Sequence, residues 1–208
     1  MNIQAIIFDF DGTIANTLEA ILKLFNEVAP KHDIPVIKNS DREKIRDFSI
    51  KELVNEYHIS PWKLLQLTRY ILPKLKNNLK DISVVEGIAE VLKDLEKQGV
   101  KIGVVTSNSK ENVELFLANQ NISQIEFIHS EKNFFGKGKV LNHLIQEQKL
   151  DKQNVVYVGD EVRDIDAARA AGISVIAVTW GFNSRKRLEQ SKPDYLITEP
   201  KQILQKIT

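Results

Sequence analysis

The sequence predicts an α/β protein, a doubly wound parallel sheet that carries a small inserted helical domain. Short apolar runs without polar alternation recur along the 208 residues, as is typical of parallel strands buried on both faces. Segments with apolar residues spaced three and four apart lie between these runs and indicate helices. Strands that alternate with helices form parallel sheets with right-handed crossovers.

The predicted strands begin with residues 3–8. The further runs are residues 100–105, 125–128, 155–158 and 175–178, with a weaker run at 195–197. The intervening helices have apolar faces that include Ile88, Val91, Leu92 and Leu95, then Val113, Phe116 and Leu117, then Val140, Leu141, Leu144 and Ile145. We expect the strand order of the flavodoxin-like type, with the functional side chains at the carboxyl ends of the strands around the switch point in strand order.

One segment interrupts the alternation. Residues 17–82 have a helical pattern throughout, with a capping box predicted at residues 40–43 and a helix start at Ser60-Pro61. We therefore predict a helical domain of residues 17–82, inserted after the first strand into a core domain of residues 1–16 and 83–208. The linkers are expected near residues 14–17 and 81–87.

Composition excludes several classes of protein. Lys and Arg number 29 and Asp and Glu 28, for a net charge of +1, so no overall field favours nucleic acid or an acidic membrane as a partner. The chain has no cysteine, which excludes disulfides, thiolate zinc sites and cysteine nucleophiles. The N-terminal apolar run meets Asp9 and Asp11 before it reaches the length of a signal peptide or a membrane span. A cytoplasmic location is expected by elimination.

Polar side chains with oxygen donors directly follow three of the predicted strands. They are Asp9 and Asp11, then Thr106, Ser107 and Asn108, then Asp160 with Asp164. Carboxylates that converge in one crevice repel one another and stay ionised when a cation lies among them. Oxygen donors without Cys or His favour Mg²⁺, so the sequence predicts a magnesium site.

The pair of aspartates suggests a chemistry. With the metal neutralising charge, the Asp9 carboxylate can attack a phosphate ester and form an acyl phosphate that water then hydrolyses. Asp11 would protonate the leaving oxygen and later take a proton from the attacking water. Gly12 permits the close turn after the pair.

These residues resemble the signatures of the haloacid dehalogenase-like hydrolase superfamily along the whole chain. The sequence DFDGT at residues 9–13 resembles its nucleophile and acid pair, and GDEVRD at 159–164 resembles its acidic metal-binding loop. The resemblance implies a Rossmann-like core with a helical cap. It implies a Mg²⁺ site formed by the Asp9 carboxylate, Asp160 and the backbone carbonyl of Asp11, with Asp164 in the outer shell of the ion. It also implies that Thr106 binds the phosphate, and we assign Ser107 and Asn108 to substrate binding with it. DAARAAG and the segment from TWGF to PDYLI resemble the phosphoglycolate phosphatase branch.

The third signature of the superfamily is a lysine that binds the phosphoryl oxygens, often within KPxP. Here the sequence reads FFGKGKVL and has no proline. Lys137 lies nearer the usual distance from the acidic loop than Lys139 does. We therefore assign the catalytic and substrate-binding lysine to Lys137.

Alternatives remain open at this stage. A dehalogenase of the superfamily lacks the second aspartate, which Asp11 supplies here. A phosphomutase similar to β-phosphoglucomutase keeps both aspartates, and a noncatalytic interaction protein on this scaffold is the alternative from another class.

Asp164 has a second interpretation, as a helix cap or a partner of Arg163. Residues 46–49 are interpreted as a connection or as a loop that closes over a small-molecule phosphate, whose identity stays open among phosphoglycolate, sugar phosphates and nucleotides.

Overall fold

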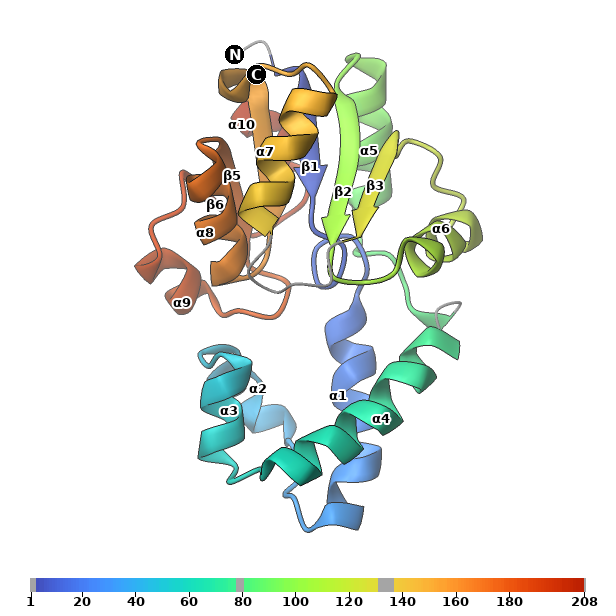
Figure 1. Cartoon of the computed structure of the whole chain (residues 1–208), viewed down its shortest axis with the longest axis vertical. Coiled ribbons are helices and arrows are strands. Elements are labelled where there is room, and N and C mark those ends of the chain that lie inside the picture. The colour runs from blue at the N-terminus through green and yellow to red at the C-terminus, as the bar shows by residue number, and fades with distance from the viewer. Residues whose placement is uncertain (1–2, 78–80, 131–136, 208) are drawn as a thin grey trace.

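The computed structural model describes residues 3–77, 81–130 and 137–207 and contains a six-stranded parallel sheet with helices packed around it (Figure 1). Its strands are β1 (Ala5–Phe8), β2 (Lys101–Thr106), β3 (Phe127–Ser130), β4 (Val155–Gly159), β5 (Ser174–Val178) and β6 (Tyr195–Ile197). All neighbouring strands are parallel. Every predicted apolar run therefore contributes a strand, and the predicted fold class is confirmed.

The strand order is β3-β2-β1-β4-β5-β6, so the expected flavodoxin-like order is wrong. The chain lays β2 and then β3 on one side of β1 and returns to the other side of β1 for β4. Apolar runs report burial and carry no information about which strands are neighbours. The direction of winding reverses between β1 and β4, and a ligand crevice is expected outside the carboxyl ends of strands at such a point.

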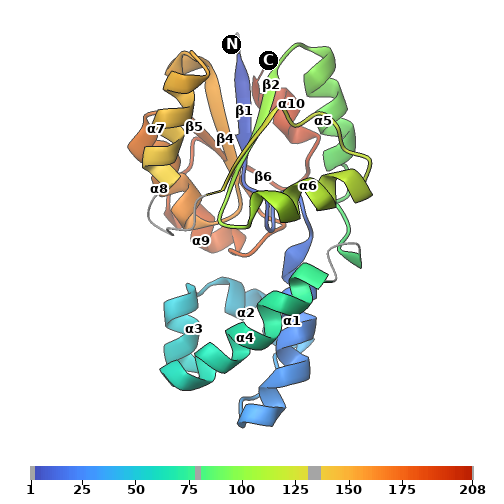
Figure 2. The same ribbon diagram turned by 45° about the vertical axis from the view of Figure 1, so that its right-hand side comes forward.

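Helices cover both faces of the sheet (Figure 2). They are α5 (Ile88–Lys97), α6 (Lys110–Asn119), α7 (Lys137–Glu147), α8 (Val162–Ala171), α9 (Arg185–Gln190) and α10 (Gln202–Ile207), with a short 3₁₀ helix, η4 (Lys152–Asn154). Ile6 and Phe8 of β1 pack with α5, α6 and α10 on one face, whereas Ala5 and Ile7 pack with α7, α8 and α9 on the other. Successive side chains of a strand point to opposite faces, so β1 is apolar on both.

Residues 17–77 form a separate set of helices beyond the carboxyl ends of the strands (Figures 1 and 2). We call them the helical group: α1 (Thr17–Val28), η1 (Ala29–His32), η2 (Asn39–Asp41), α2 (Arg42–Arg46), α3 (Ile50–Glu56) and α4 (Pro61–Asn77). They enclose an apolar cluster of their own, made of Val28, Ala29, Ile34, Ile59 and Leu67. The division of the chain into two domains at residues 17 and 82 stays a prediction.

Two predicted helix starts had different outcomes. Pro61 begins α4, and the backbone N–H of Lys63 donates to Ser60 Oγ at 3.3 Å. The capping box predicted at residues 40–43 is wrong, because these residues belong to η2 and to an α2 that has no side-chain cap. The capping box of this region is formed instead by Ser49 and Glu52, at the start of α3.

Within the described ranges, none of the helices combines the length and the apolar character that a membrane span requires.

Candidate active site

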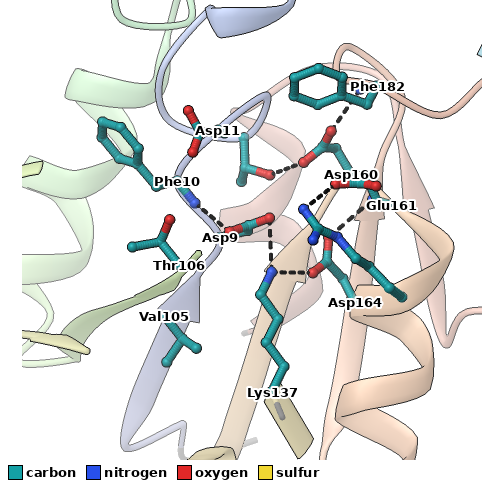
Figure 3. Close-up of polar contacts among 12 residues, drawn as sticks. Asp9, Phe10, Asp11, Val105, Thr106, Lys137, Asp160, Glu161, Asp164 and Phe182 are labelled. Atoms are coloured by element: carbon teal, nitrogen blue, oxygen red, sulfur yellow. Dashed lines mark hydrogen bonds and ion pairs between the residues drawn. The ribbon is translucent and has the colours of Figure 1, made fainter. Parts of the chain in front are cut away.

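Most of the polar residues predicted for the site lie together at the carboxyl ends of β1, β2 and β4 (Figure 3), and we call the space between their side chains the crevice. Asp9 follows β1, Thr106 ends β2, and Asp160 follows β4. Because β1 lies between β2 and β4 in the sheet, these three positions are neighbours in space. The side chains of Asp9, Thr106 and Asp160 are all buried.

Asp9 is held at the centre of the crevice. Its Oδ1 accepts a hydrogen bond from the Phe10 N–H at 2.8 Å, and its Oδ2 lies 2.9 Å from Lys137 Nζ. Oδ2 makes this ion pair without a hydrogen bond of good geometry to any described group. Burial raises the pKa of Asp9, and the charge of Asp164 raises it further, while Lys137 lowers it. A buried carboxylate oxygen is therefore directed into the crevice next to a cation.

Lys137 is the first residue of α7, and only 5% of it is exposed. Its Nζ contacts Asp164 Oδ1 at 2.6 Å as well as Asp9, and lies 5.6 Å from the centre of the Tyr157 ring. Burial alone would lower the pKa of this amine, but the carboxylates of Asp164 and Asp9 reverse the effect and raise it. Lys137 therefore stays charged. Lys139 lies two residues further along α7 and is exposed.

Asp160 is fully buried, and each of its carboxylate oxygens accepts a hydrogen bond. Thr13 Oγ1 donates to Oδ1 at 2.7 Å, and the Phe182 N–H donates to Oδ2 at 2.6 Å. Burial raises the pKa of Asp160 strongly, and the neighbouring carboxylates of Glu161 and Asp164 raise it further. A cation bound beside this carboxylate would favour its ionised form and so oppose the rise in pKa.

Asp164 both caps a helix and contacts the lysine. Its Oδ2 accepts from the Glu161 N–H at 3.0 Å in a capping box at the start of α8, while its Oδ1 binds Lys137. The helix cap foreseen as a second interpretation is thus present, and it leaves the other oxygen of Asp164 in the crevice. The other partner considered for Asp164 was Arg163, whose guanidinium donates to Glu161.

Asp11 lies at the edge of the crevice and is partly exposed. Asn108 Nδ2 donates to its Oδ2 at 3.3 Å, and the Asn108 N–H donates to Thr106 Oγ1 at 2.9 Å. Burial raises the pKa of Asp11 to about 6, with a further contribution from Asp9. Ser107 is partly exposed on the same loop. The structure thus places the predicted site residues other than Ser107 in contact around one crevice, with Asp11, Thr106 and Asn108 on its β2 side.

The arrangement fits a divalent cation. Asp9, Asp160 and Asp164 each offer a carboxylate oxygen, and these oxygens lie within 4.8 Å of one another. All three residues are buried, and buried carboxylates that share a site are stable as anions when a cation neutralises them. The carboxylate of Asp11 is not part of this group and contacts Asn108 instead.

Sequence reasoning missed a charged pair in the crevice. Glu161 Oε1 accepts from Arg163 Nη2 at 2.5 Å, and both side chains are largely buried. Burial raises the pKa of Glu161 to about 7, although Arg163 opposes the rise. Both residues lie inside the GDEVRD segment. The only signal in the sequence was the presence of two further charged residues in an acidic loop. Such residues look the same whether they are buried in a crevice or exposed to solvent.

Comparison with known proteins identifies the family. A family model described as haloacid dehalogenase-like hydrolase matches residues 6–178. A phosphoglycolate phosphatase of Synechococcus elongatus is 34% identical over 206 residues, covering 99% of this chain and 97% of the relative. The pyrophosphatase PpaX of Bacillus mycoides is 26% identical over 98% of the chain and 96% of its own length. The chain belongs to the haloacid dehalogenase-like hydrolase family.

Solved structures share the same fold. A haloacid dehalogenase-like family hydrolase of Streptococcus pneumoniae superposes with a TM-score of 0.84 at 20% identity, covering 100% of this chain and 99% of that one. The predicted resemblance to the phosphoglycolate phosphatase branch is confirmed by the cyanobacterial relative, and so is the predicted class of enzyme, a phosphatase of this family.

Proposed function

We propose that the protein is a magnesium-dependent phosphatase that hydrolyses a small-molecule phosphate monoester through an aspartyl phosphate on Asp9. The observation that carries this proposal is the position of Asp9. Its Oδ2 is buried beside the Lys137 ammonium, and its carboxylate shares a group of close oxygens with Asp160 and Asp164. A carboxylate between a lysine and a candidate cation site suits attack on a phosphate, whose charge both cations offset.

Asp9, Asp160 and Asp164 would hold Mg²⁺, which supplies charge neutralisation for the phosphoryl group when bound. In the first step the Asp9 carboxylate attacks phosphorus and the bond to the ester oxygen breaks. Lys137 offsets charge on the phosphoryl oxygens from its place between Asp9 and Asp164. The Thr106 hydroxyl accepts from Asn108, so its own proton remains available for a phosphoryl oxygen.

Asp11 would move the protons. A carboxyl group with a pKa of about 6 is protonated more often near neutral pH than an exposed aspartate. It donates its proton to the leaving oxygen in the first step. In the second step it takes a proton from water, which attacks the acyl phosphate and releases inorganic phosphate and the Asp9 carboxylate.

The relatives support a small phosphorylated substrate. One is named a phosphoglycolate phosphatase and another a pyrophosphatase. The first covers nearly the whole chain at 34% identity, so we propose a phosphoglycolate-like metabolite as the first substrate to test. Asp11 argues against a dehalogenase, whose leaving halide needs no proton.

A phosphate-release assay tests the proposal. The panel would contain 2-phosphoglycolate, pyrophosphate, hexose phosphates and nucleoside monophosphates. We expect a chelator to remove activity, Mg²⁺ to restore it, and Ca²⁺ to substitute poorly, because Ca²⁺ takes more ligands at longer distances and would displace Asp9. Full activity in a chelator, with metal verified absent, would refute the metal role. A protein that hydrolyses no ester of the panel with Mg²⁺ would contradict the proposed activity.

The two lysines of the FFGKGKVL segment give a second prediction. Lys137→Ala should lower turnover by about 10²-fold or more, because it removes a preorganised charge beside the reacting carboxylate. Lys139→Ala is the matched control, since Lys139 lies on the same helix and is exposed. Steady-state rates of the two folded variants provide the comparison. Reversed phenotypes would show that Lys139 has the role and that the assignment is wrong by two residues.

A further inference from the structure

The loop after β5 surrounds Asp160. We call residues 179–184 the β5 loop. The Phe182 N–H donates to Asp160 Oδ2 at 2.6 Å, and the Asn183 N–H donates to the Asp160 carbonyl at 3.2 Å. Asn183 Oδ1 in turn accepts from the Val162 N–H at 2.9 Å, at the start of α8. One loop therefore holds both the carboxylate and the backbone of Asp160.

The loop packs against Asp160 without free space. A Cβ atom added at Gly181 would lie 2.1 Å from Asp160 Oδ2, and one added at Gly12 would lie 2.4 Å from the same oxygen and 2.7 Å from the Phe182 ring. These distances leave no room for a side chain at either glycine, so the backbone of the β5 loop lies directly against the Asp160 carboxylate. The position of Asp160 Oδ2 therefore depends on the position of the β5 loop.

Arg46 of the helical group binds both ends of this loop. It is the last residue of α2, and its side chain is 14% exposed. Its Nη2 donates to the Thr179 carbonyl at 2.5 Å and to the Asn183 carbonyl at 3.2 Å. The Ser184 N–H donates to the Arg46 carbonyl at 2.9 Å. A planar guanidinium that bridges two carbonyls fixes their separation, and hydrogen bonds from a charged donor are stronger than neutral ones.

The orientation of the guanidinium is itself supported. Glu43 lies one turn earlier on α2 and accepts from Arg46 Nη1 at 2.6 Å. Glu43 is exposed, with 76% of its side chain accessible, so this pair orients Arg46 more than it stabilises the fold.

We propose that Arg46 is a positioning residue for Asp160 and acts through the β5 loop to set the affinity of the crevice for Mg²⁺. The inference rests on the proposed metal role of Asp160. Losing a residue that orients a metal ligand typically costs about 10- to 100-fold in metal affinity. Arg46 acts through one intervening loop, so we expect the lower end of that range. By linkage, Mg²⁺ binding strengthens the contact between the helical group and the loop by the same factor.

The chain contains a natural reporter of this loop. Trp180 belongs to it, and its Nε1–H donates to the Thr13 carbonyl at 3.2 Å. The chain has two tryptophans, and the other, Trp62, is 63% exposed on α4. A Trp62→Phe background therefore leaves Trp180 as the single indole, next to a residue that hydrogen-bonds Asp160.

The experiment compares Arg46→Met and Arg42→Met in the Trp62→Phe background. Arg42 begins the same helix and pairs with Glu19, with 40% and 49% of the two side chains accessible. Its replacement therefore removes a charge and an ion pair without touching the β5 loop. Trp180 fluorescence and calorimetry follow titration with Mg²⁺ alone, without substrate. We expect Arg46→Met to raise the Mg²⁺ dissociation constant about tenfold, Arg46→Lys to restore part of the affinity, and Arg42→Met to match the background protein.

An unchanged Mg²⁺ dissociation constant in folded Arg46→Met would overturn the inference. If Arg46→Met does not fold, Arg46→Lys is compared with Arg42→Lys by the same criterion, because lysine keeps the charge but is shorter and lacks the rigid, planar arrangement of the guanidinium donors. An equal loss in the Arg42 control would also overturn it, since the effect would then be one of charge or helix stability. A background protein that does not bind Mg²⁺ at all would instead refute the proposed metal role of Asp160.

Discussion

Asp9→Asn is expected to abolish turnover, with a loss on the order of 10⁶-fold, the scale seen when a covalent nucleophile is removed. The amide has nearly the shape of the carboxylate but carries no charge and is a poor nucleophile. It can keep the hydrogen bond from the Phe10 N–H to Oδ1, while it loses the ion pair with Lys137. Because Lys137 keeps its ion pair with Asp164, the effect should fall mainly on the chemistry.

Two measurements check this result. Acid quenching during turnover of a labelled ester should trap phosphate covalently on the unaltered protein and not on Asp9→Asn. Asp166→Asn is the matched control, because Asp166 is an exposed aspartate of α8 that pairs with Arg169. Substantial turnover by Asp9→Asn, with mass spectrometry excluding deamidation of the new side chain, would rule out the covalent mechanism.

Asp11→Asn is expected to slow both halves of the reaction, by about 10²- to 10⁴-fold. The amide cannot donate the proton that the leaving oxygen needs, nor accept one from water. Because the pKa of Asp11 is raised to about 6, the two steps should depend on pH in opposite directions. Formation of the intermediate needs the acid and slows as pH rises through about 6, whereas breakdown needs the base and slows as pH falls through it.

Single-turnover measurements separate the two steps. An aryl ester with a good leaving group needs little help from an acid, so Asp11→Asn should slow formation of the intermediate much less with p-nitrophenyl phosphate than with an alkyl phosphate. Breakdown should be slowed equally after either ester, since the intermediate is the same. An equal loss in formation for both esters would show that Asp11 orients the site and does not transfer the proton.

Patterns within the sequence determined the alternation of strands and helices and identified the polar residues at the carboxyl ends of the strands. Burial on both faces gives each parallel strand a continuous apolar run, and helices on the sheet repeat their apolar residues every three or four positions. These signals are local, so they predicted β1, β2 and β4 and placed Asp9, Thr106 and Asp160 after or at the ends of those strands.

Relations between distant segments were decided only by the tertiary structure. The strand order is one such relation, because β1 and β4 pair although they lie 150 residues apart, and no sequence pattern indicates that they are neighbours. The ion pair of Lys137 with Asp164 and the burial of the Glu161–Arg163 pair are others, since a charged residue looks the same in a sequence whether it meets solvent or a partner. The contact of Arg46 with Thr179 joins residues 133 positions apart. The acceptors of Arg46 are backbone carbonyls, which every residue type has, so no pattern of side chains predicts this contact. Only the folding of the chain brings the donor and its acceptors together.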